Sequence, residues 1–181
     1  TNPKLYNLWV GLPLDFARCD FSPESHDFVV KTFTTYLRHL SSEEHDISDE
    51  VFEYLLNFSA HLVQHPGIKP GIAILLTGVQ GSGKSTFFEV LAHVVGKSLT
   101  GCNSNTSRIF GNFNDVLKKC LLYCVDEISA SEFHKPSTVS DLKNIVTCTD
   151  IEINGKNEAI ATYPNFTRFV FTCNDWYETP V

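Results

Sequence analysis

The sequence predicts an α/β fold with a mostly parallel sheet of about five strands flanked by helices. Three apolar runs, residues 72–77, 121–125 and 168–173, have the length and composition of strands that are buried on both faces. The first run is followed by a glycine-rich stretch and then by apolar residues at helical spacing that end at Gly96, a residue typical of a helix C-cap. This order of strand, loop and helix is the repeating unit of parallel α/β proteins.

The remaining segments provide the helices and one hairpin. Helices are expected from apolar residues at helical spacing over residues 27–40, 51–64, 86–95 and 110–118. A short strand is expected near Leu99. Alternating apolar and polar residues on both sides of Asn154-Gly155 predict a hairpin over residues 151–162, with Lys156 at its tip.

Composition indicates a soluble intracellular protein. The chain has 181 residues with 43% hydrophobic and 19% charged residues, and its net charge of −7 does not favour general nucleic-acid binding. No apolar run approaches the roughly 20 residues of a membrane span, and no signal peptide begins the chain. The six cysteines form no CxxC pair, which favours buried free thiols in a reducing compartment. We assign residues 1–46 to an N-terminal helical extension and residues 47–181 to the core domain.

Residues 78–86 carry the most specific chemical signal. They fit G-x-x-x-x-G-K-[ST], the phosphate-binding loop of nucleoside-triphosphate hydrolases, and the flanking strand and helix are those the motif requires. Loop amides and the helix N-terminus offer hydrogen-bond donors to an anion. We expect ATP and Mg²⁺ as cofactors, with Lys84 reaching the β- and γ-phosphates and Ser85 binding Mg²⁺. The expected nucleotide-binding residues are Gly78, Val79, Gln80, Gly81, Ser82, Gly83, Lys84, Ser85 and Thr86.

Two further strands end in polar residues. The strand at 121–125 ends in Asp126-Glu127, where Asp126 can hold Mg²⁺ and Glu127 can act as general base on water. The strand at 168–173 ends in Asn174, which can orient the attacking water as a sensor, although an asparagine after a strand is more often only a turn residue. The expected catalytic residues are therefore Lys84, Glu127 and Asn174. This order of motifs implies that the strand ending at Asn174 lies between the other two in space.

Together these motifs resemble the ATPase core of superfamily 3 helicases, AAA+-like P-loop NTPases that form ring motors. The chain is most similar to the poxvirus- and phage-type primase-helicase branch, through residues 78–86, Val125-Asp126-Glu127, the hairpin around Lys156 and the Phe-Thr-Cys-Asn ending at Asn174. The resemblance implies an ATP-dependent DNA helicase or translocase that works as a hexameric ring on single-stranded or forked DNA. In this family a hairpin lysine contacts DNA, which implies DNA binding by Lys156 and its neighbour Asn157.

The resemblance has departures and leaves alternatives open. Some relatives have histidine where this chain has Asn157, and no arginine follows Arg168 to serve a neighbouring subunit's site. We therefore expect a fragment of a longer replication protein that also contains a covalently linked primase domain. Its expected location is a viral replication site or the host cytoplasm or nucleus. One alternative is a P-loop small-molecule kinase. Another is a nucleotide-binding assembly module that is inactive outside its ring.

Overall fold

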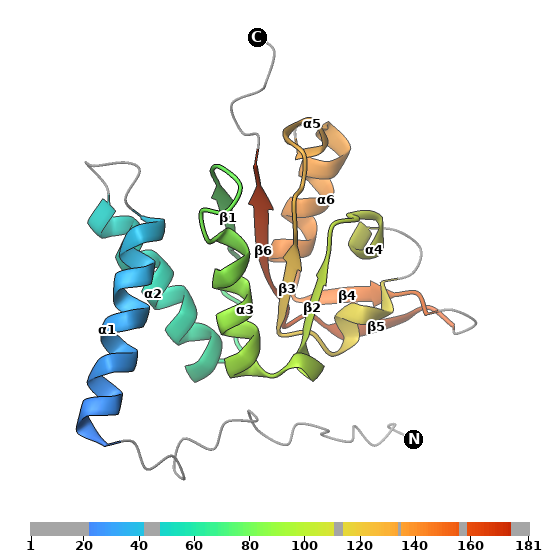
Figure 1. Cartoon of the computed structure of the whole chain (residues 1–181). Coiled ribbons are helices and arrows are strands. Elements are labelled where there is room, and N and C mark those ends of the chain that lie inside the picture. The colour runs from blue at the N-terminus through green and yellow to red at the C-terminus, as the bar shows by residue number, and fades with distance from the viewer. Residues whose placement is uncertain (1–21, 42–47, 111–113, 134, 156–158, 175–181) are drawn as a thin grey trace, which may run out of the picture.

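The structure is a computed structural model that describes residues 22–41, 48–110, 114–133, 135–155 and 159–174. Within these residues a parallel sheet lies between two layers of helices, as predicted for the α/β class (Figure 1). None of the described helices is long and apolar enough to cross a membrane.

The central sheet has four parallel strands in the order β1-β6-β3-β2. They are β1 (Ala73–Thr77), β2 (Thr100–Asn103), β3 (Leu122–Val125) and β6 (Arg168–Cys173). The prediction that β6 lies between β1 and β3 is confirmed. The prediction of about five strands is wrong for the described residues, because the segment between β3 and β6 forms helices and a separate two-stranded sheet instead of a further parallel strand.

Helices cover both faces of the sheet. One face carries α1 (Pro23–Leu40), α2 (Ser48–Gln64) and α3 (Lys84–Val95), and the other carries α6 (Pro136–Thr147). The shorter elements are α4 (Ser107–Phe110), α5 (Ala130–Phe133) and the 3₁₀ turns η2 (Lys97–Leu99) and η3 (Asp115–Lys118). The single helix expected over residues 110–118 is wrong, since α4 ends at Phe110 and η3 begins at Asp115.

Successive side chains of the strands point to opposite faces of the sheet, so the hydrophobic core has two parts, one on each face. Leu122, Cys124 and Val170 pack with α2 and α3 on one face. Tyr123 and Phe169 pack with α6 on the other. Because successive side chains of a strand point to opposite faces, a strand between two helical layers is apolar at every position. The continuous apolar runs in the sequence are therefore explained by burial on both faces.

Strand β2 is the edge of the sheet, next to β3. Its Cys102 is exposed, whereas Cys120, Cys124 and Cys173 are free and buried as the sequence predicted. At Gly101 a Cβ atom would come within 2.7 Å of the Tyr123 ring, so the close approach of these strands requires glycine at this position.

The predicted hairpin is present as β4 (Asp150–Ile153) paired antiparallel with β5 (Ala161–Pro164). Pairing ends at Ile153 and Ala161, so Asn154-Gly155 is not the two-residue turn that joins the paired strands. The predicted DNA-binding residues, Lys156 and Asn157, lie outside the described residues.

Asn114, the N-cap residue of η3, contacts β4 near the end where the hairpin turns. Its side chain donates to the Glu152 carbonyl oxygen over 2.9 Å and accepts the Asn154 N–H over 3.0 Å. The amide thus gives β4 the pair of hydrogen bonds that a neighbouring strand would supply.

Arg168, the first residue of β6, is a buried cation with 1% of its surface exposed. Its Nη2 donates to the carbonyl oxygens of His65 and Ile68, each over 2.7 Å, and lies 3.1 Å from His61 Nδ1. Its Nη1 donates to the Pro66 carbonyl oxygen over 3.3 Å. Burial lowers the pKa of Arg168 to about 10, which leaves it charged at neutral pH. The guanidinium therefore joins the start of β6 to the end of α2, where helix carbonyls favour a cation.

We expect Arg168→Met to lower the free energy of unfolding by about 3 kcal/mol, because it leaves several buried carbonyl groups without their donor. Urea unfolding monitored by circular dichroism measures this change. Arg38→Met is the control, since exposed Arg38 pairs with Asp49 at the surface and should cost less than about 1 kcal/mol. Equal effects of the two substitutions would contradict the role assigned to Arg168.

Candidate nucleotide-binding site

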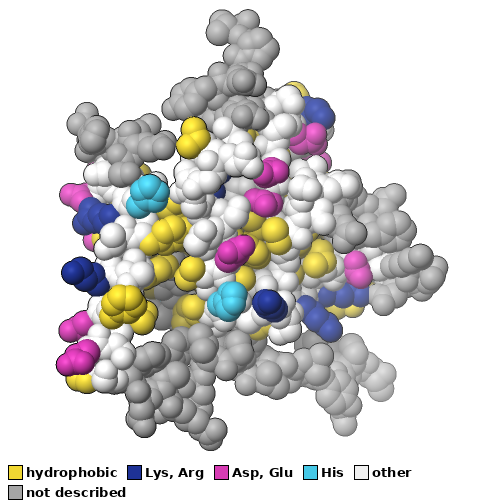
Figure 2. Space-filling view, viewed as in Figure 1, with side chains coloured by type: hydrophobic (Ala, Val, Ile, Leu, Met, Phe, Trp, Pro, Cys, Tyr) yellow, Lys and Arg dark blue, Asp and Glu magenta, His cyan; other side chains and the backbone are white. Residues whose placement is uncertain are grey.

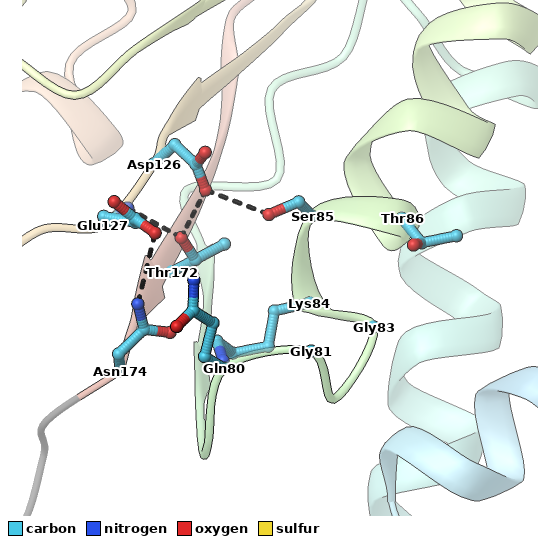
Figure 3. A pocket seen from close by; sticks show the side chains of 10 residues that line it. All are labelled: Gln80, Gly81, Gly83, Lys84, Ser85, Thr86, Asp126, Glu127, Thr172 and Asn174. Atoms are coloured by element: carbon cyan, nitrogen blue, oxygen red, sulfur yellow. Dashed lines mark hydrogen bonds between the residues drawn. The ribbon is translucent and has the colours of Figure 1, made fainter.

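Most of the predicted catalytic, nucleotide-binding and metal-binding residues converge at the carboxyl ends of β1, β3 and β6. There they surround a pocket of about 180 Å³ (Figure 3). The pocket is lined by Gln80, Gly81, Gly83, Lys84, Ser85, Thr86, Asp126, Glu127, Thr172 and Asn174. Parallel strands bring their carboxyl ends to one edge, which is where ligands bind in open α/β sheets.

The glycine-rich loop joins β1 to α3 through left-handed backbone. Gly81 has φ 83° and Gly83 has φ 95°, conformations that side chains other than glycine rarely adopt. Gly83 is the N-cap of α3 and supplies no side-chain cap. The first N–H groups of α3 therefore have no side-chain acceptor from the cap residue, and they lie beside the pocket where an anion can bind them.

Lys84 is 6% exposed and lies within the loop. Its Nζ donates to the carbonyl oxygens of Gly78 and Val79, each over 2.8 Å, and to Ser82 Oγ over 3.3 Å. These three predicted nucleotide-binding residues thus contact the lysine and are not among the residues that line the pocket. The ammonium is already positioned by neutral carbonyls, and a phosphate would replace them as a charged acceptor.

Asp126 links two of the converging strands to α3. Its Oδ1 accepts hydrogen bonds from Ser85 Oγ over 3.1 Å and from Thr172 Oγ1 over 2.7 Å. Its own N–H donates to the Asn103 carbonyl oxygen of β2 over 3.2 Å. The carboxylate is therefore held next to the first turn of α3, where Ser85 lies.

Glu127 is exposed and has the left-handed φ of 56°, a conformation that costs roughly 1–3 kcal/mol in a residue other than glycine. Its N–H donates to Thr172 Oγ1 over 2.8 Å, and its Oε1 accepts from Asn174 Nδ2 over 3.3 Å. Two hydrogen bonds from β6 thus support the strained residue. They direct its carboxylate toward Asn174 at the pocket (Figure 3).

The sequence analysis missed Thr172 and Tyr36. Thr172 is 1% exposed and joins both acids through one hydroxyl, which accepts from Glu127 and donates to Asp126. The sequence could have predicted Thr172, because residues two apart on a strand share a face and Thr172 precedes Asn174 by two. Tyr36 donates to the Gly83 carbonyl oxygen over 2.8 Å from a helix 47 positions earlier, and no local pattern predicts such a contact.

The side chains at the pocket suit a magnesium ion. Ser85 offers a hydroxyl and Asp126 a carboxylate, the oxygen ligands that Mg²⁺ prefers. In the part of the chain that the structure describes, no group of three or more His, Cys, Asp or Glu side chains could hold a metal by itself. Mg²⁺ at this position would therefore depend on phosphate oxygens and water for its other ligands.

Comparison with known families adds one assignment. A model described as a family of unknown function, DUF5906, matches residues 76–180. The chain belongs to this family. The match extends from the end of β1 beyond β6, so it contains the glycine-rich loop, both acids and Asn174. No curated protein matches the chain.

Solved structures of the NrS-1 C-terminal region have a similar fold. The apo structure of residues 305–718 is 23% identical with a TM-score of 0.65, over 77% of this chain and 33% of that one. An A-form apo structure is 20% identical with a TM-score of 0.64, over 80% of this chain and 33% of that one. This chain thus spans about a third of their length, and the likeness is one of fold.

We expect Thr172→Val to weaken Mg²⁺-dependent nucleotide binding, since Asp126 loses a donor and the Glu127 N–H loses its acceptor. It should also lower the free energy of unfolding by about 1–2 kcal/mol. Calorimetric titration with ATP, with and without Mg²⁺, measures the first effect.

Thr167→Val is the matched control for this experiment. Thr167 is also 1% exposed, and its hydroxyl donates to the Cys120 carbonyl oxygen over 2.9 Å, just before β6 begins and so at the far end of that strand from the pocket. It should cost similar stability and leave Mg²⁺ dependence unchanged. The role given to Thr172 is wrong if both variants bind Mg²⁺ and ATP alike.

Proposed function

We propose that the chain is the ATP-hydrolysing core of a superfamily 3-type DNA helicase or translocase that acts in replication. The observation that carries the proposal is the convergence of Lys84, Ser85, Asp126, Glu127 and Asn174 on one pocket. These side chains come from the first turn of α3 and from the residues that follow β3 and β6, segments that are far apart in sequence. Their types match the groups that bind phosphate, hold Mg²⁺, activate water and sense the γ-phosphate.

Each side chain has one task in this proposal. Lys84 and the amides of the loop bind the β- and γ-phosphates, while Ser85 and Asp126 hold Mg²⁺, which would neutralise charge on the phosphates. Glu127 takes the proton of the attacking water, and Asn174 orients that water. The hydrogen bond from Asn174 to Glu127 supports this pairing, because it keeps base and sensor within 3.3 Å of each other.

The two arginines whose side chains the structure describes, Arg38 and Arg168, favour water over a second substrate as phosphate acceptor. Kinases that transfer phosphate to small molecules usually place arginines around the acceptor. Arg168 is buried at the start of β6, and Arg38 covers the Phe52 ring at 3.9 Å on α2. Neither lines the pocket. We therefore rank the kinase alternative below hydrolysis.

The proposal extends to a hexameric ring on single-stranded or forked DNA, joined to a primase domain in a longer protein. The observation that supports it is the β4–β5 hairpin, the element that carries the DNA-contacting lysine in the helicases that the motifs resemble. The face in Figure 2 has positive and negative side chains interspersed among its described residues. With a net charge of −7, contact with DNA would need a focused feature such as the hairpin.

We expect Glu127→Gln to retain ATP binding and to reduce ATP turnover by at least about 100-fold, because an amide cannot accept the proton of water. Asp126→Asn should instead weaken Mg²⁺-dependent binding. Filter binding and phosphate release measure the two steps, with Lys84→Ala as the variant that should not bind nucleotide. If all three variants turn over ATP like the wild type, the pocket is not a hydrolytic site.

We expect Lys156→Ala to leave ATP binding intact and to weaken binding of single-stranded DNA by the assembled ring. Each subunit would lose one phosphate contact, so the dependence of log affinity on log salt should become flatter. A salt titration of DNA binding measures this slope. An unchanged slope and affinity would show that the DNA path does not include Lys156.

A further inference from the structure

Helix α1 is fixed on the body of the protein by contacts that do not involve the glycine-rich loop. Leu37 is fully buried in the core shared with α2 and α3. Arg38 forms an ion pair with Asp49 of α2 and lies over the Phe52 ring at 3.9 Å. These contacts therefore hold α1 in place independently of its contact with the loop.

Tyr36 of α1 contacts the loop at Gly83. Its hydroxyl donates to the Gly83 carbonyl oxygen over 2.8 Å, and its Cε2 lies 3.4 Å from where a Cβ on Gly83 would be. Tyr36 does not line the pocket, so it approaches the loop from outside. Burial, with a smaller effect of the Glu89 charge, raises the pKa of Tyr36 to about 12. The hydroxyl is thus a donor throughout the neutral pH range.

This contact restrains one peptide plane. In a planar trans peptide the carbonyl of Gly83 and the N–H of Lys84 point in opposite directions. Gly83 has φ 95°, and glycine moves between such conformations at little cost. Among the described residues, the Gly83 carbonyl oxygen also accepts a 3.3 Å hydrogen bond from the Phe87 N–H. The hydroxyl of Tyr36 is therefore the shorter of two restraints on the direction of the Lys84 N–H.

We propose that Tyr36 is a positioning residue that holds the Gly83 carbonyl and so directs the Lys84 N–H at the phosphates, which makes phosphate affinity depend on the docking of α1. This inference rests on the proposed function, because it concerns the same pocket. It gives α1 a role in phosphate binding in addition to the roles of the motif residues. Any partner or segment that displaces α1 would then weaken nucleotide binding without touching the pocket.

The test compares Tyr36→Phe with Tyr54→Phe in the full chain. Tyr54 lies on α2 with 47% of its surface exposed and does not line the pocket, so its substitution is a matched removal of one tyrosine hydroxyl. Affinities for Mg²⁺-ATP and for inorganic tripolyphosphate are measured by calorimetry, with thermal unfolding of each unliganded variant. For Tyr36→Phe we expect both affinities to fall by about 3- to 10-fold, the usual size of one lost hydrogen bond. Tyr54→Phe should match the wild type.

Comparing Mg²⁺-ATP with tripolyphosphate distinguishes the possible roles of Tyr36. Loss of ATP affinity alone would mean that Tyr36 contacts the nucleoside, and the inference is then wrong. Unchanged affinities with a lower unfolding temperature would show a purely structural role and would also overturn it. If the wild-type chain binds neither ligand, the proposed function itself fails, and the inference fails with it.

Discussion

The insertion of β6 between β1 and β3 is the constraint on which the candidate site depends. Parallel pairing on both sides of β6 brings the glycine-rich loop, the two acids and Asn174 to one edge of the sheet. Every residue of β6 is buried, and Arg168 fixes its first residue to the end of α2. The apolar strand thus determines the geometry of polar groups that lie beyond its end.

The polar groups of the pocket are organised before any ligand binds. Lys84 is held by carbonyl groups, Asp126 by Ser85 and Thr172, and Glu127 by Thr172 and Asn174. Such preorganisation reduces the cost of ordering side chains when a phosphate arrives. The left-handed backbone of Glu127 is the one strained non-glycine position among the described residues, and strain of this kind is concentrated at functional sites.

Asn114 and Tyr36 are two of the polar side chains that link separate elements of the structure. Asn114 forms two hydrogen bonds with β4 and the residue after it, near the end where the hairpin turns. Tyr36 connects α1 to the loop and fixes one peptide plane of the pocket. Both are single side chains that join segments distant in sequence. A movement of α1 can therefore change the position of the glycine-rich loop, and a movement of the segment at Asn114 can change the position of β4.

The sequence by itself determined the local units and most of the residues that meet at the candidate site. Motif spacing predicted the loop, the strand-end acids and Asn174, and the apolar runs predicted buried parallel strands, because these depend on residue type and period alone. Only the tertiary structure decided that the sheet has four described strands, that hairpin pairing ends at Ile153 and Ala161, and that Thr172 and Tyr36 join the site. These features depend on contacts between distant residues, and such contacts leave no periodic pattern in the chain.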